Sequence, residues 1–122
     1  MFGLFKKKAG ASGLQPESKW LLSINGQMIT VTDAKGQVSS ISDADLTGIA
    51  IETNDSGPWG IDFWWLLFGP EDKLACAFPQ GATGESEIFG YLKGLSDVDY
   101  DHMKKAMSST QNAVFAVWRK PA

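Results

Sequence analysis

The chain has 122 residues, of which 43% are hydrophobic and 20% are charged. This composition is typical of a single globular domain and excludes disorder for most of the chain. The net charge is only −3, but segment 36–103 holds twelve acidic residues against Lys73 and Lys93, which gives −10. Such an acidic body argues against binding to nucleic-acid phosphates and suits a basic protein partner.

Residues 1–18 are predicted to form a flexible tail in front of a single domain that spans residues 19–122. The tail has no secretory signal pattern, because its short apolar part precedes Lys6 to Lys8 instead of following them. An alternative function is a membrane-surface adaptor in which residues 1–8 contact anionic head groups, but so short a segment would hold only weakly. The single cysteine, Cys76, has no disulfide partner and favours a reducing cytoplasm.

The domain begins with a predicted hairpin, because Asn25-Gly26 is a strong signal for a two-residue turn. The cross-strand pairs expected on its core face are Trp20 with Val31 and Leu22 with Ile29. A third strand over residues 37–41 is rich in serine, which predicts an edge or half-exposed strand with Ile41 opposite Ile29. A fourth strand is predicted over residues 48–53, with Ile49 and Ile51 inward.

The most apolar stretch, residues 57–69, predicts a strand over residues 61–68 that is covered on both faces. In an alternative interpretation the face with Trp64, Leu66 and Phe68 is uncovered and forms an interaction site. The residues predicted to bind a partner are then Asp55, Gly57, Pro58, Trp59, Asp62 and Trp64. A further strand follows over residues 74–78.

Beyond Pro79 the apolar spacing becomes helical. Thr83 is expected to cap a first helix, whose apolar stripe consists of Ile88, Tyr91, Leu92 and Leu95. Ser96 and Asp99 resemble a capping box for a second helix, whose stripe consists of Tyr100, Met103, Ala106 and Met107. A last strand over residues 113–118 completes an α+β fold: a mostly antiparallel β-sheet meander, then two helices and a C-terminal strand.

Few residues suggest catalysis or metal binding. Asp97, Asp99 and Asp101 match the opening of a calcium loop, but His102 stands where that loop needs glycine. His102 is the only histidine, so a small enzyme using His102 with nearby carboxylates is an alternative function. Glu52 and Asp62 on neighbouring strands are a possible carboxylate pair. No cofactor or metal motif is present.

Several segments resemble a family of small uncharacterised bacterial single-domain proteins. The likeness covers residues 20–118, and its most specific part is the Asp-Ser-Gly-Pro loop at residues 55–58 before the Asp-Phe-Trp-Trp strand at residues 62–65. The chain departs from the family pattern at residues 95–99, where Pro-Gly-Phe-Asp is expected. The resemblance implies a bacterial single domain and brings no activity or catalytic residue with it.

The leading hypothesis from the sequence is a non-enzymatic protein-binding module. The acidic balance suggests that it neutralises a basic partner, and self-association is the other form of contact that we expect. We expect no nucleic-acid partner and no cofactor, and we do not expect contact with a membrane surface.

Overall fold

The computed structural model describes residues 19–54, 63–109 and 111–121. Within these residues the chain has an α+β fold, as predicted. The strands are β1 (Leu21–Asn25), β2 (Met28–Thr32), β3 (Val38–Ser42), β4 (Gly48–Thr53), β5 (Phe63–Phe68), β6 (Leu74–Pro79) and β7 (Ala113–Arg119). The helices are the short 3₁₀ turn η2 (Pro70–Asp72), α2 (Ser86–Lys93) and α3 (Tyr100–Ser108).

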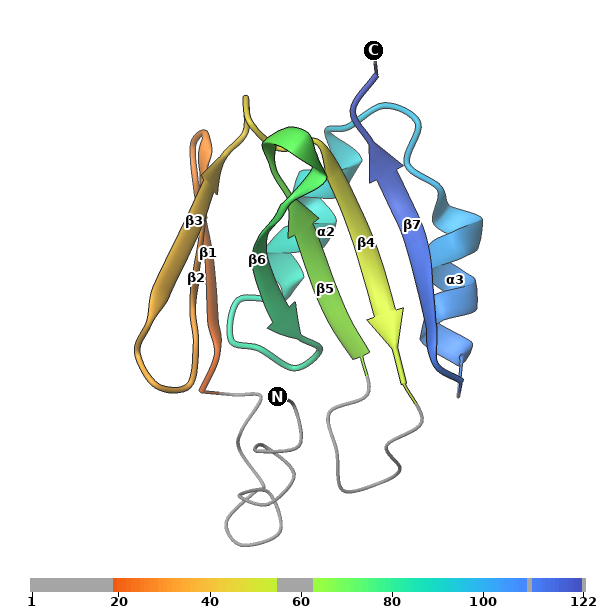
Figure 1. Cartoon of the computed structure of the whole chain (residues 1–122), viewed down its shortest axis with the longest axis horizontal. Helices are drawn as coiled ribbons and strands as arrows, with labels where there is room; N and C mark the ends of the chain where they lie inside the picture. Colours follow the sequence, from red (N-terminus) through yellow and green to blue (C-terminus); the bar gives the residue numbers. More distant parts are fainter. Residues whose placement is uncertain (1–18, 55–62, 110, 122) are drawn as a thin grey trace, which may run out of the picture.

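The strands form two antiparallel sheets, whereas the sequence suggested one. The first sheet has the order β1-β2-β3 and the second has the order β6-β5-β4-β7, so the last strand returns to lie beside β4. The first sheet stands beside the second at its β6 edge, where β2 and β3 contact β6 (Figure 1). Both α2 and α3 lie on one side of the four-stranded sheet, behind the strands in Figure 1.

The first hairpin has the predicted core face but a different register. Leu22 lies opposite Val31, and Asn25 lies opposite Met28, so the turn consists of Gly26 and Gln27 rather than Asn25 and Gly26. Only Gly26 has a positive φ in this turn, which fits a type II′ turn with glycine at its first central position. The shift moves each partner by two residues and therefore leaves the same side chains facing inward. The predicted pair of Ile29 and Ile41 is confirmed.

Both predicted helix caps are wrong. Helix α2 begins two residues later than expected, after Glu85, because the backbone of Thr83 bonds to β1 instead: its N–H donates to Trp20 and its C=O accepts from Leu22, both at 2.8 Å. Helix α3 is capped by Asp99 rather than Ser96, since the Asp99 carboxylate accepts the backbone N–H of His102 at 2.9 Å. In the predicted stripe of α3, Tyr100 and Met107 are exposed, and only Met103 and Ala106 are buried.

Most of the core lies between the helices, the three-stranded sheet and the rear of the four-stranded sheet, and a smaller part with Ala50, Trp64 and Leu66 lies on the other sheet face. Trp65 is fully buried at the centre of the larger part, stacked at 6.2 Å on Phe78 and edge-on to Phe89 at 5.6 Å. Its indole N–H donates to the Glu85 carboxylate at 2.8 Å, so its one polar atom is satisfied. Cys76 is also buried, as predicted, and burial raises the pKa of its thiol.

Candidate functional site

Most of the predicted binding residues fall outside the part of the chain that the structure describes. These are Asp55, Gly57, Pro58, Trp59 and Asp62, and their role stays a prediction. Trp64 is only 1% exposed and packs edge-on against Trp20 at 5.2 Å. The interpretation in which Trp64 and Leu66 form an exposed patch is therefore wrong, because both side chains are buried.

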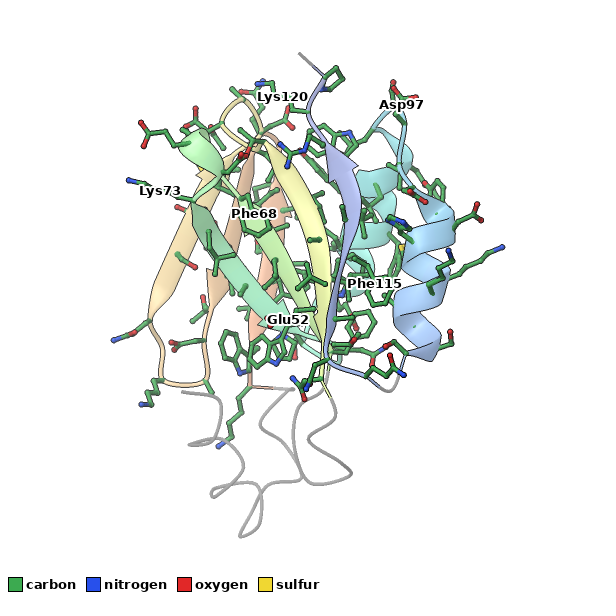
Figure 2. All side chains as sticks on the ribbon, turned by 45° about the vertical axis from the view of Figure 1, so that its right-hand side comes forward. Glu52, Phe68, Lys73, Asp97, Phe115 and Lys120 are labelled. Atoms are coloured by element: carbon green, nitrogen blue, oxygen red, sulfur yellow. The ribbon has the colours of Figure 1, made fainter. Side chains whose placement is uncertain are left out.

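A different part of the same sheet face is accessible. The strand register places Ala50 opposite both Leu66 and Ala116, and it places Glu52 opposite Val114. Phe115, one residue along β7, points the other way and meets the ring of His102 on α3, which identifies this second face as the helix-covered one. In Figure 2, Phe115 lies between β7 and α3, whereas Glu52 and Phe68 lie on strands away from that helix.

We define the open face as the accessible half of this sheet face. It is made of Gly48, Glu52, Phe68, Val114, Ala116 and Arg119 around the buried Ala50. In Figure 1 both α2 and α3 lie behind the sheet, on the side away from this face. Val114 is 61% exposed and Ala116 is also exposed, so the open face is apolar between the charged Glu52 and Arg119 and has one protruding valine. An accessible apolar surface of this kind is typical of a protein contact site.

A β-bulge in β7 shapes the upper end of the open face. Ile49 lies opposite Trp118, whereas Ala50 lies opposite Ala116, so Val117 is an additional residue in the strand. The extra residue allows both Val117 and Trp118 to be buried on the helix side, where the Trp118 indole N–H donates to the Ser96 carbonyl at 3.0 Å. It also shifts Arg119 onto the open face beside Gly48.

Next to Arg119 the open face is hollowed. The hollow has a volume of about 140 Å³, and its lining includes Gly48, Phe68, Asp72, Ala116 and Arg119. A space of about this size is sufficient for a small side chain. The Arg119 guanidinium at its rim lies 3.7 Å from the Asp72 carboxylate, and both side chains are largely exposed. The hollow can therefore receive a small apolar side chain that has a carboxylate beside it.

His102 has a structural role at the outer edge of β7. Its Nδ1 atom lies 2.8 Å from the carbonyl oxygen of Ala116, and the Asp99 backbone N–H donates to the carbonyl of Val117 at 2.7 Å. Two outward carbonyls at the bulge are thus paired with the start of α3, which protects this edge from pairing with another strand. The carbonyl acceptor requires Nδ1 to carry a proton, and the Asp99 carboxylate lies 3.5 Å from the same atom.

The other candidates for chemistry are dispersed. Glu52 lies on the open face, but its proposed carboxylate partner Asp62 lies outside the described residues. Asp99 is engaged as a helix cap, and the described residues contain no group of three or more His, Cys, Asp or Glu side chains that could hold a metal ion. His102 lines neither the hollow beside Arg119 nor the hollow on the three-stranded sheet.

A second hollow lies on the three-stranded sheet and has a volume of about 240 Å³. Its lining includes Trp20, Val31, Gln37, Val38 and Ser39. Val38 is 65% exposed, which is close to the exposure of Val114 on the open face. The two valines therefore provide a matched pair for testing which hollow receives a partner.

Comparison with known proteins gives no assignment: no family model, curated protein or solved structure matches the chain. In the described residues no helix is both long and apolar enough to cross a membrane. The sequence had pointed to residues 55–64 because of their aromatic content. The sequence contains no comparable signal for the open-face residues of β7. Which face Val114 and Ala116 occupy depends on how β7 pairs with β4.

Proposed function

We propose that this chain is a protein-binding module that contacts its partner through the open face. The observation that carries the proposal combines an apolar part of a sheet face that α2 and α3 do not cover, the exposed Val114 and the hollow beside Arg119. A sheet normally buries one face and solvates the other with polar side chains. Here the second face carries glycine, alanine, valine and phenylalanine along β4, β5 and β7, which favours contact with another protein surface.

The charges near the open face give limited support to a basic partner. The turns at the upper end of the sheet carry Asp43, Asp45, Glu71 and Asp72, but Lys73, Arg119 and Lys120 lie among them. Opposite charges therefore nearly balance at this end, whereas a neutralising surface for a basic partner would show an excess of carboxylates. Neutralisation of a basic partner stays a prediction, and strong weakening of binding by salt would support it.

The proposal is tested with Val114→Asp as bait in affinity capture from a native cell extract, alongside the wild type and Val38→Asp. We expect any partner that the wild type retains to be retained also by Val38→Asp and to be lost with Val114→Asp. A carboxylate at residue 114 would have to be buried against apolar surface, which weakens binding by at least about tenfold.

Circular dichroism establishes that both variants are folded, and each substitution replaces a strand valine of similar exposure. Loss of the partner with Val38→Asp alone would show that the binding site is the hollow on the three-stranded sheet. Retention of the partner by both variants would overturn the proposal.

A further inference from the structure

We infer that the surface which covers the open face is the open face of a second copy of this chain. The inference rests on the proposed function, because it names the partner of the same site. It comes from the observation that this face carries both a binding site and the groups that fit that site. The site is the hollow with the Arg119 guanidinium at its rim, and the fitting groups are Val114 and the neighbouring Glu52.

The positions of these groups are compatible with a twofold-symmetric dimer. On β4, Gly48 and Glu52 each lie two residues from Ala50, in opposite directions. Gly48 lies opposite Arg119 on β7, and Glu52 lies opposite Val114. We consider two copies stacked face to face, related by a twofold axis that lies between the sheets and runs perpendicular to the strands at Ala50. This axis places the Glu52–Val114 end of one copy over the Gly48–Arg119 end of the other. Closed dimers of this kind use the same patch on both subunits.

Shape and charge both fit this arrangement. Val114 protrudes from one end of the open face, and the hollow of about 140 Å³ lies at the other end. The centre of the face is formed by Ala50 and Ala116, whose small side chains permit the close approach of about 10 Å found between packed sheets. Glu52 of each copy approaches Arg119 of the other, so the dimer contains two equivalent opposite-charge contacts.

The size of the face predicts a weak dimer. Because Trp64 and Leu66 on β5 are buried, the face consists mainly of β4 and β7. Two strands spaced at about 4.8 Å and six residues rising about 3.3 Å each give about 200 Å² per copy. The total of about 400 Å² is roughly a third of the smallest standard interface between proteins. We therefore expect reversible association with a dissociation constant between about 100 µM and a few millimolar, so the monomer predominates in dilute solution.

The test is sedimentation equilibrium of the purified full chain from about 10 µM to about 2 mM, a range that spans the expected dissociation constant. We expect the mean mass to rise toward that of a dimer. Val114→Asp should weaken association by at least about tenfold, and Val38→Asp should leave it unchanged. A chain that stays monomeric throughout this range would overturn the inference, as would equal weakening by both variants.

A charge-reversal mixture tests the twofold arrangement. Glu52→Arg alone and Arg119→Glu alone each place like charges together at both contacts, so each variant should self-associate more weakly than the wild type. An equimolar mixture of the two variants forms both contacts with opposite charges, and its association should return toward the wild-type level. Association of the mixture that is no stronger than that of the separate variants would overturn the arrangement.

The outcomes separate this inference from the proposed function. A chain that remains monomeric while Val114→Asp loses a different captured protein overturns the second copy as the occupant and leaves the proposed function intact. Self-association that Val114→Asp does not affect overturns the second copy as the occupant, and both proposals fall if the captured partner is also retained by Val114→Asp.

Discussion

Gly84 is the residue at which the backbone leaves least room for substitution. It has a φ of +90°, and a Cβ atom at this position would lie 2.2 Å from the Leu22 carbonyl oxygen. The close approach arises because Thr83 pairs with β1 through two backbone hydrogen bonds. We expect Gly84→Ala to lower the free energy of unfolding by about 3 kcal/mol, since it adds a steric clash to an unfavourable φ. Urea unfolding measures this change.

Gly90 provides the matched control within the helix that follows. It lies in the interior of α2, is exposed, and has nothing within 4 Å of the position that a Cβ would take. Gly90→Ala should therefore raise the free energy of unfolding by about 0.5–1 kcal/mol, because alanine is the better helix former. Equal effects of the two substitutions would contradict the role assigned to the Thr83–β1 contact.

The sequence could identify Gly84 as part of a loop but not as a close-contact position. Gly81-Ala-Thr-Gly84 has the composition of a turn. The obstacle to a side chain at Gly84 is the Leu22 carbonyl, which is 62 residues away in the chain and is brought there only by the tertiary fold. The same limit explains the wrong cap at Thr83, since its backbone is engaged by β1 rather than by the helix.

At the level of single elements, Asp99 holds the start of α3. Its carboxylate accepts the His102 backbone N–H, and its own N–H donates to the Val117 carbonyl on β7. We expect Asp99→Ala to lower the free energy of unfolding by about 1 kcal/mol, because the substitution removes the cap. Hydrogen exchange at the His102 amide should accelerate more than exchange at the buried residues of β5.

Asp99→Asn is the control for this prediction. Asparagine caps helices about as well as aspartate and keeps the side-chain acceptor, so its effect should stay within a few tenths of a kcal/mol. Destabilisation by Asp99→Asn equal to that of Asp99→Ala would mean that the negative charge beside His102 matters more than the cap.

The sequence predicts where the strands and helices lie better than how they pair. All seven strands were expected, since alternation and turn residues are local signals, and Ile88 and Leu92 were correctly placed on the buried side of α2. The register of the first hairpin was wrong by one residue at the turn, because Gly26 can occupy either central position. The bulge at Val117 has no local signal, since it results from packing Val117 and Trp118 against the helix layer.

At the scale of the molecule, the candidate site could not be found from the sequence for a similar reason. The aromatic content of residues 57–69 led to the prediction of Trp64 as a binding residue, yet Trp64 is buried, as the prediction of a strand covered on both faces required. An alternating strand pattern shows that Val114 and Ala116 share a face, but only the position of α3 decides that Phe115 faces the core. Which sheet face remains open therefore depends on how the layers pack together, and it cannot be predicted from a single strand.

Tyr91 joins two layers of the molecule, because its hydroxyl on α2 donates a short hydrogen bond to the Asp43 carboxylate in the β3–β4 turn. Burial raises the pKa of Tyr91, and the hydrogen bond and negative charge of Asp43 raise it further. The folded chain therefore holds this proton to higher pH than the unfolded chain, in which tyrosine has a pKa of about 10. The stability from Tyr91 is fully present below about pH 10 and is lost as pH rises above this value.

We expect Tyr91→Phe to lower the free energy of unfolding by about 1 kcal/mol at pH 7, through loss of the hydrogen bond. Above pH 10 the stability of the wild type should fall more steeply than that of Tyr91→Phe, because only the wild type loses the Tyr91 contribution as the unfolded chain ionises. Urea unfolding of both proteins between pH 7 and pH 11 measures the two slopes, and lysine deprotonation affects both proteins alike. Parallel slopes would show that the Asp43 contact does not shift the ionisation of Tyr91, and the link between α2 and the β3–β4 turn would then contribute only packing.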